Sequence, residues 1–257
     1  MSLSVTGPVR QTGTFFAFAL DVIVAIPRRP FQWREFVQQA WFIASVTILP
    51  TALVSIPFGA VIALQLGSLA RQLGAQSFTG AASVLAIIRE AGPIVTALLI
   101  AGAAGSAICA DLGARKIREE IDAMEVLGIS PIQRLVVPRV VASVVVAVLL
   151  NGLVSVVGVG GGYFFNVILQ DGTPGAYLAA FTALAQLPDL WAGEAKAFVF
   201  GALAAIVASY KGLHAQGGPK GVGDAVNMSV VITFMLLFFV NFIMTAVYFQ
   251  VVPQKGM

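Results

Sequence analysis

The sequence predicts an all-α membrane protein, with an interfacial helix near the N-terminus and five transmembrane helices after it. Of its 257 residues, 58% are hydrophobic and only 11% are charged, whereas a soluble domain carries about 25% charged residues. Too few polar side chains are present to cover a surface that faces water. Five long apolar runs follow one another along the chain, so lipid is the main solvent.

We expect residues 14–40 to form one or two amphipathic helices lying on the membrane surface. Their apolar part contains Asp21 and is shorter than the about 20 residues needed to cross a bilayer. Arg28, Arg29 and the aromatic residues after them suit the headgroup region. A tilted additional span is the alternative. Because the two arginines follow the first apolar run, the N-terminus does not resemble a cleaved signal peptide.

The five apolar runs are long enough to be transmembrane helices. The third contains a glycine cluster that favours close helix packing or a kink. Between the third and fourth runs, residues 170–189 predict a loop with a short interfacial helix. We therefore divide the chain into an N-terminal part, 1–40, and one membrane domain, 41–257. The predicted spans are 41–67, 81–111, 135–169, 190–210 and 226–252.

The positive charges set the expected orientation of these spans. With five spans the two termini lie on opposite sides, and Lys and Arg are enriched on the cytoplasmic side. We therefore expect a cytoplasmic N-terminus and an outer C-terminus in a multi-pass protein of the cytoplasmic membrane. This places 11 of the 15 Lys and Arg residues inside: Arg10, Arg28, Arg29, Arg34, Arg115, Lys116, Arg118, Arg134, Arg139, Lys211 and Lys220.

A charged segment between the second and third runs, "ARKIREEIDAMEVLG", predicts a cytoplasmic helix of about four turns between Gly113 and Gly128. Ile117, Ile121 and Met124 would form one apolar stripe. The order of the charges, bases first and acids last, is unfavourable in a single helix. Pairs at i,i+4 spacing (115 with 119, 116 with 120, 118 with 122) would have the weaker orientation.

The acids favour a protein partner for this helix. Anionic headgroups would account for the basic residues but not for four acids in seven residues. A plain solvated loop is the alternative. The residues predicted to dock the partner are Arg115, Lys116, Arg118, Glu119, Glu120, Asp122 and Glu125.

Three polar residues inside the spans are candidates for a site. Arg89 and Glu90 lie at membrane depth, where charges are costly and are paired or functional. They could form a salt bridge or a polar rim near a lipid headgroup. Lys196, with Glu194, could complement this rim or act as an interfacial anchor.

Small residues in the second run, Gly102, Gly105 and Ser106, predict close helix packing, either within the chain or against another chain. The glycine-rich segment 210–226 predicts a cytoplasmic connection, which either contacts a partner or only joins two spans.

Several activities are disfavoured by composition. The chain has one histidine and one cysteine, so we expect no metal site and no catalytic constellation. No Gly-Lys dipeptide occurs, which excludes a Walker A nucleotide loop. The excess of positive charge is explained by membrane orientation, and we expect no nucleic-acid partner. An ion-coupled transporter would usually carry ionisable groups in several spans, which counts against that class.

The run "REAGPIVTALLIAGAAGSAICADLGARKIREEIDAMEVLGISP", followed by "VVPR", resembles the signature of the MlaE/YrbE permease family. A second block, "SYKG" with "GGPKGVGDAVNMSVV" and "TAVYF", agrees. These permeases are membrane subunits of ABC-type lipid transporters that work with MCE proteins. The resemblance covers nearly the whole chain from about residue 40.

The resemblance implies that "REEIDAMEVLG" is the coupling helix for a cytoplasmic ABC ATPase dimer, which would bind ATP and Mg²⁺. It also implies a lipid pocket within a permease dimer, beneath an assembly of Mce proteins. The segment "AGAAGSA" has Ala103, and "REAGP" has Ala91, where many members carry Arg and His. This version is similar to permeases of mycobacterial Mce loci.

The mycobacterial resemblance implies a heterodimer with a second YrbE-type permease and import of fatty acids or sterols. Phospholipid in a homodimeric Mla-like system is the alternative.

Overall fold

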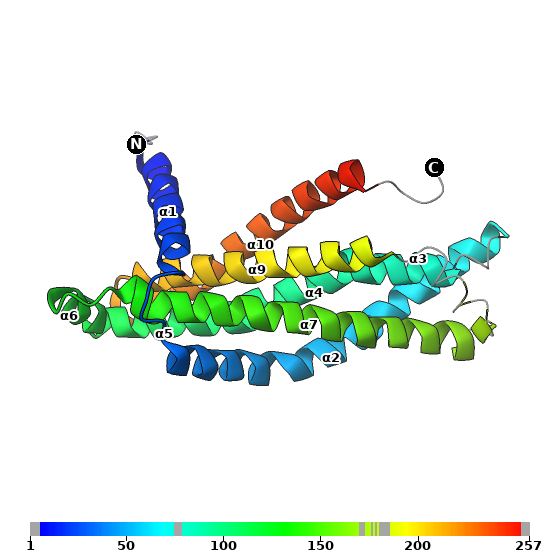
Figure 1. The fold of residues 1–257 in the computed structure, drawn as a ribbon, viewed down its shortest axis with the longest axis horizontal. Helices are drawn as coiled ribbons and strands as arrows, with labels where there is room; N and C mark the ends of the chain where they lie inside the picture. Colours follow the sequence, from blue (N-terminus) through cyan, green and yellow to red (C-terminus); the bar gives the residue numbers. More distant parts are fainter. Residues whose placement is uncertain are drawn as a thin grey trace.

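The computed structural model describes residues 6–74, 79–169, 173–175, 177, 179 and 186–252, and nearly all of these residues are helical. Among these described residues, five helices are long and apolar enough to cross a membrane. They run up and down along the long axis of the molecule, and the end of α10 points away from the end that carries α1 (Figure 1). The predicted fold class is confirmed.

The elements follow the predicted order. The N-terminal helix is followed by the first span, the segmented second span, a short charged helix, the segmented third span and two further spans. Their bounds are α1 Thr6–Ala25, α2 Trp33–Gln72, α3 Thr79–Ala86, η2 Ile87–Ala91, α4 Gly92–Leu99, η3 Ile100–Gly105, α5 Ser106–Ile117, α6 Glu120–Val126, η4 Ile132–Val136, α7 Val137–Phe164, η5 Phe165–Leu169, α9 Leu187–Leu213 and α10 Gly218–Val251.

Several boundaries differ from those the sequence predicts. Residues 33–40, expected on the membrane surface, form the first two turns of α2. The expected connection 210–226 is mostly helix, since α9 extends to Leu213 and α10 begins at Gly218. Apolar runs underestimate helix length because polar turns continue each helix beyond the hydrocarbon. Most of the loop and helix expected at 170–189 lies outside the described residues.

The N-terminal helix α1 stands away from the bundle at the end that also carries α6 (Figure 1). Its C-terminal half packs closely, with Phe18 and Val22 buried. Phe15 and Phe18 contact the ring of Tyr210 on α9 at centroid distances of 5.3 and 5.6 Å. Phe16 and Leu20 are exposed, so α1 has one face against the protein and one apolar face available to lipid.

Glycine allows the spans to approach one another closely. A Cβ on Gly59 of α2 would overlap the carbonyl oxygen of Gly158 on α7. On α9, a Cβ on Gly201 would lie 2.8 Å from Cβ of Ala147, and one on Gly212 would lie 2.8 Å from the Cys109 carbonyl oxygen. Within the third-span glycine cluster, Gly158 and Gly161 lie against neighbouring helices, whereas a Cβ on Gly160 would meet nothing within 4 Å. Small residues at helix contacts are typical of membrane bundles.

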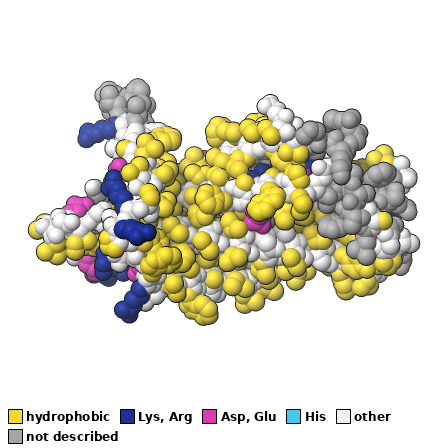
Figure 2. Space-filling model, viewed as in Figure 1, with side chains coloured by type: hydrophobic (Ala, Val, Ile, Leu, Met, Phe, Trp, Pro, Cys, Tyr) yellow, Lys and Arg dark blue, Asp and Glu magenta, His cyan; other side chains and the backbone are white. Residues whose placement is uncertain are grey.

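The last span is the least covered. Only 11% of the most apolar window of α10 is buried, against 56% for the second and third spans. Phe242 and Met235 are about 70% exposed. Figure 2 shows that apolar side chains dominate the visible face and that Lys, Arg, Asp and Glu gather mainly at one end. This distribution matches a bundle that spans a membrane with its charged end in water.

Replacing Gly59 by Ala should lower the thermal unfolding midpoint in detergent, because the new Cβ forces α2 away from α7. We expect a loss of about 1–3 kcal/mol, the usual cost of overpacking. Gly152→Ala on α7 is the matched control, since a Cβ there meets nothing within 4 Å. An equal midpoint for both variants would contradict the packing role of Gly59.

Candidate functional site

The predicted partner-docking segment is two helices rather than one. α5 ends at Ile117, and Glu119 adopts a left-handed conformation with φ of 61° before α6 begins at Glu120. The backbone N–H of Glu119 donates to the carbonyl of Lys116, which closes α5. The expectation of one continuous helix of four turns is therefore wrong. The apolar stripe is also broken, since Ile121 is buried while Ile117 is 36% exposed.

The break explains the charge order that is unfavourable in a single helix. Arg115 and Lys116 lie in the last turn of α5, and Glu120 and Asp122 lie in the first turn of α6. Bases at a helix C-terminus and acids at an N-terminus are each favourable. Two short helices therefore satisfy both helix dipoles.

The ion pairs differ from those expected at i,i+4 spacing. Arg115 pairs with Asp111 at 3.2 Å and approaches Glu120 at 3.7 Å. Arg118 pairs with Glu120 at 2.8 Å, and Lys116 pairs with Asp122. The left-handed residue turns α6 so that its first-turn acids face back toward the bases of α5. The expected pairs of Arg115, Lys116 and Arg118 with Glu119, Glu120 and Asp122 are replaced by these.

The outer surface of α6 combines acids with exposed apolar side chains. Val126 is 88% exposed and Leu127 is 73% exposed. Glu125 and Asp122 are exposed beside them. α6 lies at one end of the molecule, beyond the spans (Figure 1), where the charged side chains gather (Figure 2). Contiguous exposed apolar surface is typical of a site that contacts another protein or a membrane.

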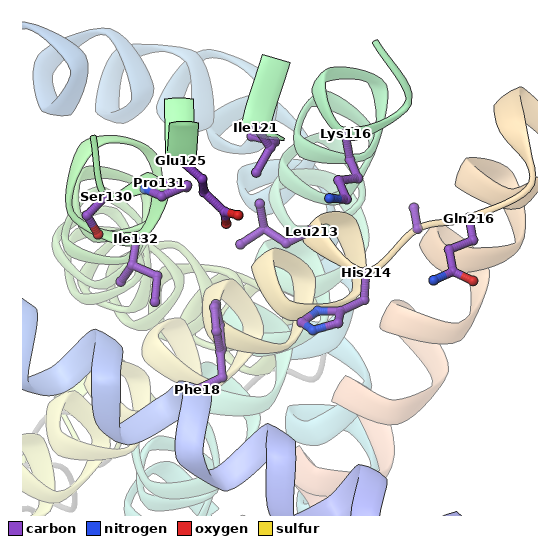
Figure 3. Close-up of a pocket in the computed structure, with 11 residues that line it drawn as sticks. Phe18, Lys116, Ile121, Glu125, Ser130, Pro131, Ile132, Leu213, His214 and Gln216 are labelled. Atoms are coloured by element: carbon purple, nitrogen blue, oxygen red, sulfur yellow. The ribbon is translucent and has the colours of Figure 1, made fainter. Parts of the chain in front are cut away.

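A cavity of about 400 Å³ lies beneath α6. Phe18 of α1, Ile121 and Glu125 of α6, Leu213 of α9 and His214 line it together (Figure 3). α6 is thus packed on the bundle through Ile121 and leaves space beside this contact.

The polar residues predicted within the spans come together between η2, α9 and α10. Lys196 pairs with Glu90 at 2.8 Å. The Lys196 ammonium also donates to the Arg89 carbonyl oxygen at 2.9 Å and to Thr245 Oγ1 at 2.7 Å. Lys196 is only 3% exposed, so its three N–H donors are all satisfied inside the protein.

A proline accounts for one of these contacts. In an α-helix the Arg89 carbonyl would accept from the N–H of residue 93, but Pro93 has none. The helix locally widens to the π form over η2, where the Gly92 N–H donates to the Ile87 carbonyl. Lys196 supplies the missing donor. Single π turns are frequent at functional sites.

Arg89 has a separate partner that sequence reasoning missed. It pairs with Asp189 at 2.6 Å, and Tyr248 donates to the same carboxylate. Asp189 is held at the start of α9 by a capping box with Gln186. Asn241 and Thr245 donate to Glu90 at 3.1 and 3.0 Å. The spacing of residues 241, 245 and 248 on one face of a helix was the available sequence signal.

Glu194 does not join the Lys196 cluster. It accepts from Asn151 on α7 at 3.1 Å. This contact joins the third and fourth spans across 43 positions, and Arg89 with Asp189 joins the second and fourth across 100 positions. The polar residues therefore hold the second to fifth spans together.

The small residues of the second span differ in how closely a neighbouring helix approaches them. Gly105 faces α9, with Ala208 Cβ 3.8 Å from the position of a Cβ. A Cβ on Gly102 would meet nothing within 4 Å. Ser106 is half-buried. Within the described residues Gly102 therefore has room for a larger side chain.

An open groove of about 1100 Å³ lies between α1, α9 and α10. Arg10, Lys211 and Asp224 give it a charged part, and Met228 and Leu236 give it an apolar part. Such a surface is compatible with an amphipathic molecule.

Residues 36–247 match the protein family described as Permease MlaE, which is most of the chain. The chain belongs to the MlaE permease family. As an MlaE permease it is a membrane component, and the expectation of a non-catalytic ABC permease subunit is confirmed. Within the described residues, no group of three or more His, Cys, Asp or Glu side chains could hold a metal ion.

Relatives of this permease extend across bacteria and plants. A probable ABC transporter permease protein of Rickettsia bellii is 32% identical over 242 residues, covering 94% of this chain and 93% of the relative. The intermembrane phospholipid transport system permease protein MlaE of Haemophilus influenzae is 28% identical over 214 residues, covering 83% and 82%. The chloroplastic protein trigalactosyldiacylglycerol 1 of Arabidopsis thaliana is 29% identical over 235 residues, covering 90% and 66%.

Glu90→Gln should destabilise the permease by about 2–3 kcal/mol, because it leaves the charge of Lys196 without its counter-ion. The double variant Glu90→Gln with Lys196→Gln should lose less than the sum of the two single changes. Thermal unfolding in detergent measures both. Glu125→Gln, on the exposed surface of α6, is the control and should leave the midpoint unchanged. Additive losses would contradict the pairing.

Proposed function

We propose that this permease is the transmembrane subunit of an ATP-driven lipid transporter in the cytoplasmic membrane. The match to the MlaE family over residues 36–247 carries the proposal. The Haemophilus relative, named for intermembrane phospholipid transport, supports a lipid cargo. The amphipathic groove and the largely uncovered α10 are compatible with a cargo and a partner that both come from the membrane.

The ATPase is proposed to dock on α6. Val126 and Leu127 offer apolar side chains, and Asp122 and Glu125 offer negative charge, on one exposed surface. Acyl chains do not suit this surface, because it lies at the end of the molecule where the charged side chains gather (Figure 2). ATP and Mg²⁺ would bind to a dimer of ATPase subunits, and the permease would bind neither.

The remaining partners follow from the proposed orientation. With α6 in the cytoplasm, the N-terminus lies inside and the C-terminus outside. A second YrbE-type permease would cover the exposed apolar surface of α10, and Mce proteins would bind on the outer side. A heterodimer is favoured by the all-small segment "AGAAGSA", which is similar to mycobacterial permeases.

Two classes of lipid are candidates for the cargo. The name of the Haemophilus relative favours a phospholipid. The resemblance to mycobacterial Mce permeases favours fatty acids or sterols and import. Arg89, Glu90 and Lys196 would form the polar rim beside the lipid pocket, with their charges already neutralised by neighbouring residues.

Val126→Glu should abolish recovery of the ATPase when the permease is purified from detergent-solubilised membranes. The side chain is 88% exposed, so the substitution leaves folding intact and places a charge in the apolar part of the contact. Mass spectrometry of the co-purifying proteins measures the loss. Arg134→Gln, an exposed change at the same end, is the control.

With the wild-type chain we expect an ABC ATPase, a second permease and Mce proteins. Selective loss of the ATPase from the Val126→Glu sample supports docking on α6. A wild-type permease that purifies without any ATPase would contradict the proposed function and favour an ion-coupled transporter.

The cargo can be tested with the complete transporter in liposomes. Transfer of a fluorescent phospholipid, fatty acid or sterol should require ATP for the true cargo class only. Transfer driven by a proton gradient without ATP would contradict the proposal.

A further inference from the structure

A chain of ion pairs runs from the first span to α6. Its centre is Arg139 on α7, whose side chain is only 1% exposed. One guanidinium nitrogen lies 2.7 Å from Oδ2 of Asp111 on α5 and 3.1 Å from Oε1 of Glu35 on α2. The other donates to the Leu135 carbonyl oxygen at 2.7 Å. One buried side chain therefore joins three spans.

The chain continues from Asp111 to the proposed docking helix. Both carboxylate oxygens of Asp111 accept from Arg115 Nε, at 3.2 and 3.3 Å. Arg115 approaches Glu120 on α6 at 3.7 Å, and Glu120 also binds Arg118 at 2.8 Å. Acidic and basic groups thus alternate without interruption from α2 through α7 and α5 to α6.

Stability alone does not explain a buried arginine at this place. Taking a guanidinium and its carboxylates out of water is costly, and apolar residues of similar size are often equally or more stabilising. Arg139 Nε is buried without a hydrogen-bond partner. Apolar packing would hold these helices together equally well. What the ion pairs add is a link of fixed geometry between the helices.

The attachment of α6 makes this link mechanically important. Ile121 is the one buried residue of α6. The helix lies between two positive-φ residues, Glu119 and Gly128, and the cavity lined by Phe18 and His214 lies beneath it. Besides Ile121, the partly buried Met124 and the chain itself, ion pairs tie α6 to the spans.

We propose that Glu35, Asp111 and Arg139 are positioning residues that transmit movement of α6 to the spans α2 and α7. This inference rests on the proposed function, since an ATPase must move α6. Ion pairs of fixed geometry resist separation, so displacement of the Glu120 end pulls Asp111 and, through Arg139, the cytoplasmic ends of α2 and α7. Breaking the chain leaves docking intact and uncouples ATP hydrolysis from lipid movement.

The test uses the complete transporter reconstituted in phosphatidylethanolamine–phosphatidylglycerol liposomes, with a fluorescent phosphatidylglycerol as the probe. ATP hydrolysis and probe transfer are measured together for Asp111→Asn and Glu35→Gln. These carboxylates are 41% and 28% exposed, so both variants should fold. We expect ATPase recovery and hydrolysis near wild type, with probe transferred per ATP reduced about fivefold or more, the range of site-to-site coupling.

Three further variants separate transmission from a structural role. Asp111→Glu keeps the charge and should restore the transfer ratio. Arg134→Gln removes a guanidinium at the same end, bound to Gln32 at 3.3 Å and outside the chain, and should not change it. The double variant Asp111→Asn with Glu35→Gln should lose little more than either single variant, because one break already interrupts the chain.

The possible results separate failure of this inference from failure of the proposed function. Variants that lose thermal stability and both activities in proportion, with an unchanged ratio of transfer to hydrolysis, would overturn the inference while leaving the proposed function standing. A wild-type transporter that moves neither this probe nor the fatty acid and sterol probes in response to ATP would overturn the proposed function and the inference together.

Discussion

A charge that leaves water must find its partners inside the protein, and the bundle is organised around two such charges. Lys196 distributes its three donors over a carboxylate, a hydroxyl and the backbone carbonyl that Pro93 leaves without a donor. Arg139 distributes its guanidinium over two carboxylates and a carbonyl. In a medium without water an unpaired polar group costs several kcal/mol. Each basic residue therefore fixes the relative positions of several helices.

These two cation sites occupy different levels of the bundle and join different helices. Lys196 links the second, fourth and fifth spans in the region of η2. Arg139 links the first, second and third spans near the end that carries α6. All five spans are thus tied by charge at one level or the other. Between the levels the contacts are apolar and close, as at Gly59 and Gly201.

The sequence was sufficient for the number, order and approximate limits of the spans, because hydropathy reports directly on the solvent of each helix. It also identified Arg89, Glu90 and Lys196, because charges are rare within apolar runs. It did not predict that Arg89 pairs with Asp189, since the two lie 100 positions apart and no local pattern encodes that distance. Asp111 and Glu35 were missed for the same reason.

The turn at Glu119 was missed for a different reason. A left-handed residue is usually glycine or asparagine, and a glutamate between good helix formers predicts a continuous helix. The unfavourable charge order was the signal that this prediction conflicted with electrostatics. Two helices with opposite ends facing each other satisfy both helix dipoles. At Glu119, favourable interactions with the two helix dipoles outweigh the local preference for a continuous helix.

The composition of the polar cluster has a consequence for biosynthesis. Arg89, Glu90, Asp189 and Lys196 enter the membrane with the second and fourth spans, whereas Asn241, Thr245 and Tyr248 come only with the last. Until α10 leaves the ribosome, Glu90 and Asp189 lack some of the donors they have in the finished protein. α10 buries little apolar surface against the other spans, so the polar contacts define its position. The order of synthesis makes its insertion the step that supplies the remaining donors to Glu90 and Asp189.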